Sequence, residues 1–322
     1  MAIACRSFAK INLGLRIGAA RADGFHDLLT VYQTIALHDV IHVSVERGSG
    51  IEIKCSDPRV PRDESNTCYR IAERVMPALA AKGRVVIEIE KRLPVQGGLG
   101  GASANAVATL LGLERALRKK LPATERLRIA AEVGSDLPLF LVGGTVLGVG
   151  RGEQVYPLPD LPAIPCVVVT PEIGVSTPKA FADWDRINAG AKLTASAASD
   201  RMNELGRGLS AWLSEPYSSA PSSFTERGRA ENPLLWLVRA GIENDFEQVV
   251  FPEYPELCEG KHALVRAGAK YASLSGSGST LYGLFGSKGA AKRAAVRLRK
   301  QGWAAQATVT LTRRGYWSRI FD

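Results

Sequence analysis

The fold of this chain is decided by the stretch Pro94-Val95-Gln96-Gly97-Gly98-Leu99-Gly100-Gly101-Ala102-Ser103-Ala104-Asn105-Ala106, in which four glycines join a charged strand to an apolar helix. Glycine has no Cβ atom, so the backbone can approach a phosphate closely. The first N–H groups of the following helix have no intrahelical partner, and the helix dipole adds partial positive charge there. The stretch therefore predicts an anion site suited to a nucleotide triphosphate, with a flexible glycine loop as the alternative.

The segments on either side of the glycines favour the anion site. Residues 85–91 alternate apolar and charged side chains over their second half, as a strand with one buried face does. Residues 104–113 are small and apolar on all sides, which is typical of a buried helix. No Lys-Ser/Thr pair follows the glycines as in a P-loop, and the third glycine of the dinucleotide fingerprint is missing after Gly98 and Gly100. We therefore expect a different nucleotide-binding architecture.

The composition is that of an ordinary globular protein. A chain of 322 residues that is 46% hydrophobic is long enough for two domains with their own cores. The formal net charge of +9 is spread along the chain, and its densest cluster, at residues 288–300, has the spacing of a solvated helix face. Because no nucleic-acid motif accompanies the charge, we expect anionic small-molecule substrates and no nucleic-acid partner.

The cysteines and the apolar segments indicate a cytoplasmic protein. The five cysteines are scattered without a CxxC pair, so neither a zinc knuckle nor a disulfide framework is expected. No apolar run is long enough to span a bilayer, which predicts no membrane partner. The N-terminal residues lack the apolar core of a secretion signal and are expected to be part of the fold.

Strand and helix patterns alternate along the chain and predict the α+β class. The four prolines of residues 157–165 indicate a connection between two domains, at 1–160 and 161–322. Between residues 188 and 231 the pattern decays into Ala, Ser, Arg and Gly, which predicts a variable insertion. From residue 271 onward, a β-turn-β-α-β succession is expected. The expected strands are 40–45, 51–55, 85–91, 166–170, 271–275, 281–285 and 304–310, and the expected helices include 66–81, 124–133 and 288–300.

Phosphoryl transfer needs a phosphate cradle, positive charge, and a group that orients or deprotonates the acceptor hydroxyl. The cradle is residues 97–103, where Ser103 either caps the helix or reaches a Mg²⁺ ion. Lys10 lies in a strand of alternating side chains that places it on the same face as Asn12. The alternative interpretation is that Lys10 is a solvated surface lysine. Asp136 offers the carboxylate, with a plain helix cap as its alternative.

Several separated motifs make the chain resemble the GHMP family of small-molecule kinases along nearly its whole length. The glycine loop and the Gly-Ser turn place it in the superfamily. Two further motifs are similar to the members whose acceptor is a polyol linked to cytidine diphosphate. The resemblance implies a two-domain α+β fold, ribosomal-protein-S5-domain-2-like at the N-terminus and ferredoxin-like at the C-terminus, with ATP and Mg²⁺ as cofactors. The motifs are Ala9-Lys10-Ile11-Asn12-Leu13, Arg21-Ala22-Asp23-Gly24-Phe25-His26, Lys91-Arg92-Leu93-Pro94 with its glycines, Gly134-Ser135-Asp136-Leu137-Pro138, and Ser275-Gly276-Ser277-Gly278-Ser279.

The resemblance implies roles for the candidate residues. Asp136 is the general base for the acceptor hydroxyl, and Lys10 keeps Asp136 ionised and the hydroxyl oriented, since a neighbouring ammonium favours a carboxylate. Asn66 lies near the nucleotide base. The phosphates of ATP are bound by Pro94, Gly97, Gly98, Leu99, Gly100, Gly101, Ala102 and Ser103.

For the acceptor, the resemblance implies an aromatic stack on cytosine and a histidine that reads the base edge. Phe25, His26 and Phe181 occupy the matching places, and Thr177 and Asn12 complete the substrate set. Phe25 stands where the family pattern has tyrosine, so a phenol hydrogen bond is lost while the stack is kept. Taken alone, Phe25 could instead anchor the core and His26 could belong to a turn.

The turn at residues 276–280 is an ordinary hairpin or a nest of backbone N–H groups that binds an oxyanion. The resemblance assigns Gly276, Ser277 and Gly278 to the diphosphate side of the site. The function implied is phosphorylation of the 2-hydroxyl of a cytidine diphosphate-linked polyol in isoprenoid precursor synthesis. The alternatives are a mevalonate- or homoserine-type kinase, whose acceptors carry no nucleobase for residues 21–26, and a non-catalytic binding module, which would not need Lys10 and Asp136.

Overall fold

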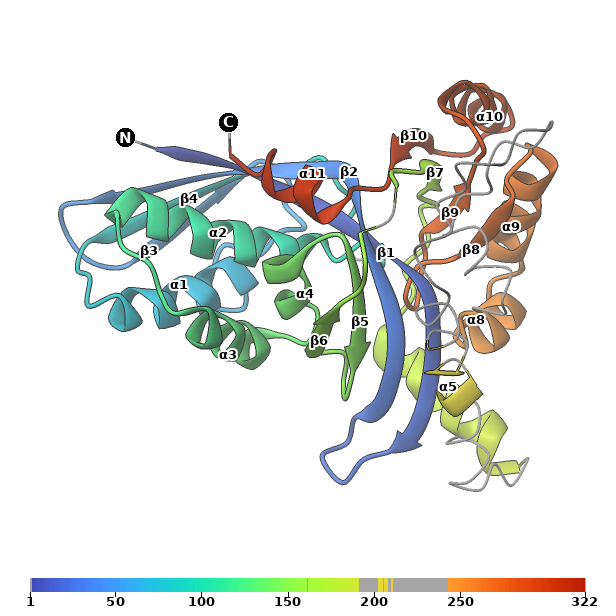
Figure 1. Cartoon of the computed structure of the whole chain (residues 1–322), viewed down its shortest axis with the longest axis horizontal. Helices are drawn as coiled ribbons and strands as arrows, with labels where there is room; N and C mark the ends of the chain where they lie inside the picture. The colour runs from blue at the N-terminus through green and yellow to red at the C-terminus, as the bar shows by residue number, and fades with distance from the viewer. Residues whose placement is uncertain are drawn as a thin grey trace, which may run out of the picture. The chain divides into compact units, whose positions relative to one another are not determined.

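The computed structural model describes residues 2–95, 97–160, 162–190, 202–204, 206–207, 210 and 243–321. The chain forms two compact units (Figure 1). Unit 1 contains residues 1–11, 32–160 and 310–322, and unit 2 contains residues 12–31 and 161–309.

These units differ in two segments from the continuous domains expected at 1–160 and 161–322. Residues 12–31 group with unit 2, and residues 310–322 group with unit 1. The physical reason for the first difference is the length of two paired strands, β1 (Ile3–Ala20) and β2 (His26–Glu46), each of which contributes to both units. A boundary placed by proline content alone does not detect a hairpin of this length.

Unit 1 is built on a six-stranded mixed sheet with the order β3-β4-β2-β5-β6, in which β1 also pairs with β2. Strand β4 (Arg84–Glu90) is antiparallel to β2 and parallel to β3 (Ile51–Cys55). The parallel pair is connected through helix α1, as a parallel pair requires a crossover. The alternation expected in β4 is confirmed, because its apolar side chains are buried while Glu88 and Glu90 are exposed. The last two strands are β5 (Thr145–Val149) and β6 (Gln154–Pro157).

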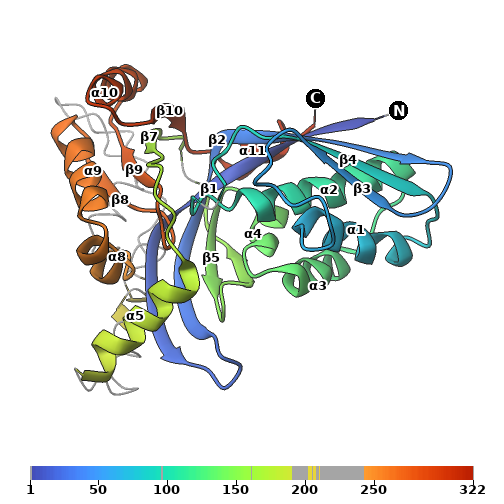
Figure 2. The same ribbon diagram turned by 180° about the vertical axis from the view of Figure 1, so that it is seen from behind.

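The helices of unit 1 complete its core. Figures 1 and 2 show α1, α2 and α3 side by side along the sheet. The buried helix expected after the glycines is confirmed and longer than expected, since α2 is buried continuously from Ala104 to Glu114. The helix bounds are α1 Thr67–Ala78, α2 Gly101–Leu117, α3 Ala123–Val133, α4 Leu137–Val142 and α11 Arg313–Trp317.

Unit 2 is built on a four-stranded antiparallel sheet with the order β10-β7-β9-β8. The expected β-turn-β-α-β succession is confirmed, and the β8–β9 hairpin is closed by a hydrogen bond of 2.9 Å from the Ser275 N–H to the Thr280 carbonyl. The strands are β7 Pro165–Val169, β8 Tyr271–Leu274, β9 Leu281–Leu284 and β10 Ala305–Val309, and the helices are α5 Thr177–Gly190, α8 Glu247–Glu253, α9 Pro255–Arg266 and α10 Lys288–Lys300.

Helix α10 carries the densest basic cluster as a solvated face, as expected. Its lysine and arginine side chains are exposed, while Ala291, Ala294, Ala295 and Leu298 pack into the core of unit 2. The insertion expected at 188–231 lies mostly outside the described residues. All five cysteines lie in the described part of the chain, and none is joined in a disulfide. No described helix is long and apolar enough to cross a membrane.

Candidate active site

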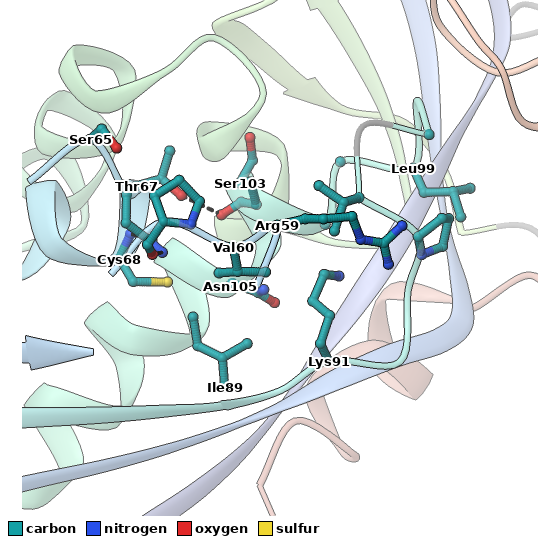
Figure 3. Close-up of a pocket in the computed structure, with 18 of the residues that line it drawn as sticks. Arg59, Val60, Ser65, Thr67, Cys68, Ile89, Lys91, Leu99, Ser103 and Asn105 are labelled. Carbon is teal, nitrogen blue, oxygen red and sulfur yellow. Dashed lines mark hydrogen bonds between the residues drawn. The ribbon is translucent and has the colours of Figure 1, made fainter. Parts of the chain in front are cut away.

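Unit 1 contains a pocket of about 340 Å³ at the start of helix α2 (Figure 3). Three segments form its wall: residues 59–68 before and in α1, residues 89–95 at the end of β4, and residues 97–105. The structure therefore brings together all the residues expected to bind the nucleotide. They are Asn66, Pro94, Gly97, Gly98, Leu99, Gly100, Gly101, Ala102 and Ser103.

The geometry of the glycine loop suits an anion. Gly100 is the N-cap of α2 in the left-handed conformation, with φ of 67°, and it has no side chain to cap the first N–H groups of the helix. Those groups are thus available to phosphate oxygens. Ser103 does not cap the helix, contrary to one expectation, because α2 already begins at Gly101. The loop is tied to β1 by a hydrogen bond of 3.0 Å from the Lys10 N–H to the Leu99 carbonyl.

We expect Gly100→Ala to weaken ATP binding at least tenfold. A Cβ atom at this position would lie 3.0 Å from the side chains of Lys10 and Phe140, and the left-handed backbone adds a cost of about 1 kcal/mol. The matched control is Gly50→Ala, where φ is 95° and no atom lies within 4 Å of the new Cβ. Isothermal titration with ATP should give wild-type affinity for the control, and wild-type affinity for Gly100→Ala would contradict the cradle.

A buried acid that was not predicted from the sequence, Asp39, organises the pocket wall. Its side chain has no solvent exposure. Its carboxylate accepts hydrogen bonds from Lys91 Nζ at 2.7 Å, from the backbone N–H groups of Arg92 and Leu93 at 2.7 Å, and from Asn105 Nδ2 at 3.0 Å. Asp39 therefore joins the end of β4 to the first turns of α2. An acid within an apolar strand is the sequence signal that could have revealed it.

Two cations, Lys91 and Arg59, line the pocket and were also missed. Lys91 is held by Asp39, and Arg59 makes two hydrogen bonds to Asp57, at 3.0 and 2.7 Å. Figure 3 shows both side chains at the pocket. Together they place two ion pairs, each with its cation at the pocket, beside the glycine loop.

Asn66 has a structural role in addition to its place in the pocket. Its Oδ1 accepts a hydrogen bond of 2.8 Å from the Cys68 N–H, which caps helix α1. Its Nδ2 donates to the Pro61 carbonyl at 2.6 Å. The Asn66 amide thus orders this segment of the pocket wall.

Lys10 and Asp136 form an ion pair in unit 1. Lys10 Nζ lies 3.2 Å from Asp136 Oδ2. Lys10 is only 4% exposed, so the alternative of a solvated surface lysine is wrong. Asp136 precedes α4 but makes no side-chain capping bond, so the plain-cap alternative is also wrong. Its carboxylate faces Lys10 because the buried ammonium needs a partner.

A third side chain, Tyr32, completes this cluster and was not identified from the sequence. Its hydroxyl donates a hydrogen bond of 3.0 Å to Asp136 Oδ1, on the oxygen that Lys10 does not contact. Burial, followed by the charge of Asp136 and this hydrogen bond, raises the pKa of Tyr32 well above its usual range. The two oxygens of the Asp136 carboxylate therefore face different donors, Tyr32 at Oδ1 and Lys10 at Oδ2.

In unit 2, two of the residues expected to bind cytidine, His26 and Phe181, form an aromatic stack. The rings of His26 and Phe181 stack at 4.8 Å and 10°, and His26 Nε2 lies 2.7 Å from Asp185 Oδ1. His26 is buried at the start of β2, so it is not a turn residue as its alternative suggested. Phe25 is 49% exposed, which rules out a core anchor. The exposed ring of Phe25 is available for stacking, and the buried His26 is paired with a carboxylate.

The other two residues expected to bind the substrate, Thr177 and Asn12, make polar contacts within unit 2. Thr177 Oγ1 lies 2.6 Å from Ser277 Oγ, which joins the start of α5 to the Gly-Ser turn. Asn12 is buried and donates through Nδ2 to Thr30 Oγ1 at 2.8 Å. The carbonyl of Asn12 accepts a hydrogen bond of 2.9 Å from the Tyr282 hydroxyl.

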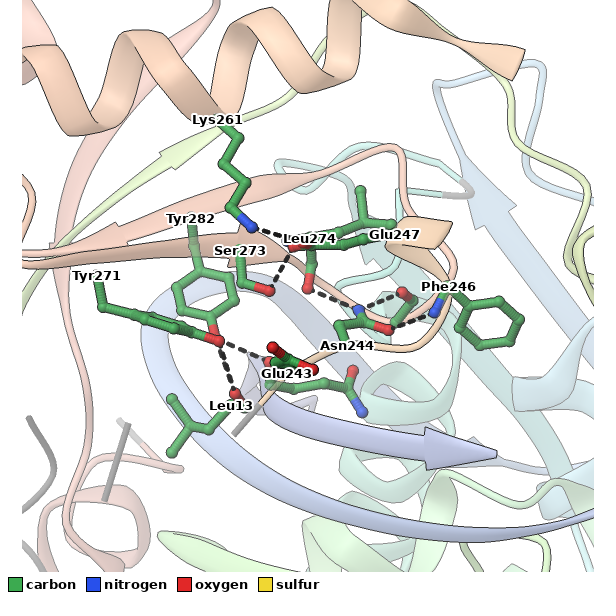
Figure 4. A network of polar contacts seen from close by, with 12 residues as sticks. Leu13, Glu243, Asn244, Phe246, Glu247, Lys261, Tyr271, Ser273, Leu274 and Tyr282 are labelled. Carbon is green, nitrogen blue, oxygen red and sulfur yellow. Dashed lines mark hydrogen bonds and ion pairs between the residues drawn. The ribbon is translucent and has the colours of Figure 1, made fainter. Parts of the chain in front are cut away.

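A buried network holds the Gly-Ser turn in place (Figure 4). Asn244 Nδ2 donates to the carbonyls of Leu274 and Gly276 at 2.9 and 2.8 Å. Glu247 accepts from Ser273 Oγ at 2.7 Å and from the Leu274 N–H at 2.9 Å. The turn is thus more than an ordinary hairpin loop, because its carbonyls are fixed from outside the hairpin.

Comparison with known proteins identifies the class. The model of the GHMP kinases N terminal domain matches residues 66–144, and that of the GHMP kinases C terminal matches residues 232–303. A homoserine kinase from Cytophaga hutchinsonii shares the fold, with a TM-score of 0.72 at 21% identity over 97% of this chain and 95% of that one. The expected two-domain α+β GHMP kinase fold is therefore confirmed.

Relatives with higher sequence identity show the family within this class. The 4-diphosphocytidyl-2-C-methyl-D-erythritol kinase of Solibacter usitatus is 40% identical over 90% of this chain and 83% of its own length. The kinase of the same name from Acaryochloris marina is 34% identical over 90% of this chain and 89% of its own length. A crystal structure of 4-(cytidine 5'-diphospho)-2C-methyl-D-erythritol kinase matches with a TM-score of 0.71 at 29% identity, over 96% of this chain and 99% of that one. The chain belongs to the GHMP kinases, in the family of 4-diphosphocytidyl-2-C-methyl-D-erythritol kinases.

Proposed function

We propose that this protein transfers the γ-phosphoryl group of ATP to the 2-hydroxyl of 4-diphosphocytidyl-2-C-methyl-D-erythritol, a step in isoprenoid precursor synthesis. The observation that carries the proposal is the ion pair of Lys10 and Asp136, at 3.2 Å. Lys10 lies on β1, which is hydrogen-bonded to the glycine loop. A carboxylate, an ammonium and a phosphate cradle are the parts that phosphoryl transfer to an alcohol requires. The relatives named above carry this activity in their names.

The chemical step assigns each group a role. The loop of residues 97–103 binds the phosphates of ATP through backbone N–H groups. Asp136 accepts the proton of the acceptor hydroxyl while the hydroxyl oxygen forms a bond to the γ-phosphorus of ATP. The bond between the γ-phosphorus and the β–γ bridging oxygen breaks, which releases ADP. Lys10 stabilises the negative charge that develops on the attacking oxygen.

A magnesium ion fits this pocket as a companion of the triphosphate. Magnesium in kinases is held largely by phosphate oxygens and waters, with few protein ligands. Among the residues that the structure describes, no group of three or more His, Cys, Asp or Glu side chains is placed to hold a metal by itself. The hydroxyl of Ser103, which lines the pocket, is the oxygen that we assign to the ion. When bound, the ion neutralises charge on the β- and γ-phosphates.

The cytidine end of the acceptor is assigned to unit 2. Phe25 offers an exposed ring for stacking on cytosine, and His26 with its Asp185 partner offers a polar group for the base edge. Phe181 supplies a second aromatic ring beside His26. The Gly-Ser turn, with Thr177 bonded to Ser277, is assigned to the diphosphate.

An acceptor panel tests the function. ADP release from Mg-ATP is measured with the cytidylated methylerythritol, with mevalonate and with homoserine. Turnover confined to the cytidylated acceptor is expected. Turnover with mevalonate or homoserine would replace the proposed acceptor, and no turnover with any of the three would favour a binding module.

We expect Phe25→Ala to raise the KM for the acceptor about tenfold, since stacking of a base on an aromatic ring contributes about 1–3 kcal/mol. The KM for ATP should not change. Because Phe25 is half exposed, its removal leaves the core intact. The control is Tyr156→Ala, an exposed aromatic that is 53% accessible on β6. An unchanged acceptor KM in Phe25→Ala would contradict the stacking role.

A further inference from the structure

The hydroxyl of Tyr32 is placed to act on the Asp136 carboxylate. Tyr32 lies on β2 and Lys10 on β1, and they contact different oxygens of the Asp136 carboxylate, at 3.0 Å and 3.2 Å. A carboxylate held at both oxygens cannot rotate about its Cβ–Cγ bond without breaking one of these contacts. Its remaining lone pairs therefore keep one direction.

The protein is built to keep this hydroxyl where it is. Tyr32 is 2% exposed, and Lys10 Nζ lies 5.5 Å from the centre of its ring. The hydroxyl packs against the backbone of Gly152, where φ is 97° and a Cβ atom would lie only 2.4 Å from the Tyr32 oxygen. A residue other than glycine at 152 would displace the hydroxyl from Asp136.

We propose that Tyr32 is a positioning residue for phosphoryl transfer, which fixes the orientation of the Asp136 carboxylate so that it can take the proton of the acceptor hydroxyl. This inference rests on the proposed function, in which Asp136 is the base. Tyr32 is not itself the base, because its hydroxyl remains protonated and donates its hydrogen to Asp136. It acts by holding the carboxylate in one orientation through a hydrogen bond to a charged group.

The test is Tyr32→Phe, which removes the hydroxyl and keeps the ring beside Lys10. We expect kcat to fall about tenfold, in line with the loss of one hydrogen bond to a charged group. The KM values for ATP and for the acceptor should stay within about twofold of wild type, because Tyr32 acts on the transition state rather than on ground-state binding. A fall in affinity with unchanged kcat would overturn the proposal.

Tyr316→Phe is the matched control. Tyr316 is also buried in unit 1, and its hydroxyl donates a hydrogen bond of 2.7 Å to the carbonyl of Phe140 on α4. This variant loses a buried hydroxyl donor on the helix that follows Asp136, but not a contact to the carboxylate. It should lose thermal stability and retain kcat. An equal loss of kcat in Tyr316→Phe and Tyr32→Phe would assign Tyr32 a merely structural role and overturn the proposal.

A double-mutant cycle separates this inference from the proposed function. Adding Tyr32→Phe to Asp136→Ala should cause no further loss of the residual rate, because the group that Tyr32 positions is gone. The same cycle in urea unfolding, without any substrate, should give non-additive unfolding free energies. If wild-type protein fails to phosphorylate the acceptor, the proposed function is wrong. The unfolding cycle then still measures the coupling between Tyr32 and Asp136. Additive effects there would overturn the inference.

Discussion

Asp136→Asn should lower kcat about a thousandfold, within the range that general base catalysis supplies. The amide has nearly the same shape as the carboxylate, but it cannot accept the proton of the acceptor hydroxyl. It also leaves Lys10 beside a neutral partner. Binding of ATP should change little, because Asp136 does not line the pocket formed by the glycine loop. Steady-state kinetics and calorimetric titration with ATP measure the two quantities separately.

Glu125→Gln is the control for this change. It replaces a half-buried acid on α3, which is paired with Arg128, by its amide and should keep wild-type kcat. If Asp136→Asn lost ATP binding and kept its turnover, Asp136 would belong to the nucleotide site and would not be the base.

Asp39→Ala should destabilise the protein by about 3–5 kcal/mol, the cost of leaving one member of a buried ion pair without its partner. Lys91 would keep a buried ammonium, and the N–H groups of Arg92 and Leu93 would lose their acceptor. The end of β4 would then no longer be tied to α2 through Asn105. Urea unfolding measures the loss, and the pocket wall should bind ATP more weakly.

The double variant Asp39→Ala/Lys91→Met separates the stranded charge from the other lost bonds. Removing the ammonium should recover part of the unfolding free energy, because the uncompensated charge is gone while the backbone donors still lack their acceptor. A loss below about 1 kcal/mol in Asp39→Ala would contradict the organising role of this carboxylate.

The local pattern of the chain was sufficient to predict many of its regular elements, but not β5, β6, α8 or α11. In β4, the alternation of valine and isoleucine with glutamate follows directly from one buried face. Helix α10 was predicted from basic residues spaced around alanines and Leu298, and these alanines are buried as that spacing requires. The glycines were informative because a left-handed residue at Gly100 is a backbone requirement that few other residues meet.

Contacts between distant residues could not be predicted in this way. Tyr32 and Asp136 are 104 positions apart, and nothing in the pattern around Tyr32 distinguishes it from an ordinary core tyrosine. Strand β1 is buried on both faces, so its alternation did not reveal that Lys10 is buried. The roles of Lys10, Asp136 and Phe25 were inferred only through the family resemblance, because pattern alone favoured a surface lysine, a cap and a core anchor.

The most direct test of phosphoryl transfer to the acceptor hydroxyl is ³¹P NMR of a single reaction that contains the protein, Mg-ATP and 4-diphosphocytidyl-2-C-methyl-D-erythritol. We expect one new phosphomonoester resonance that grows with ADP, while the diphosphate resonances of the acceptor are retained. The same reaction with Asp136→Asn should show no such resonance over the same time. Formation of ADP with inorganic phosphate alone, or an unchanged spectrum with the wild-type protein, would contradict phosphoryl transfer to this hydroxyl.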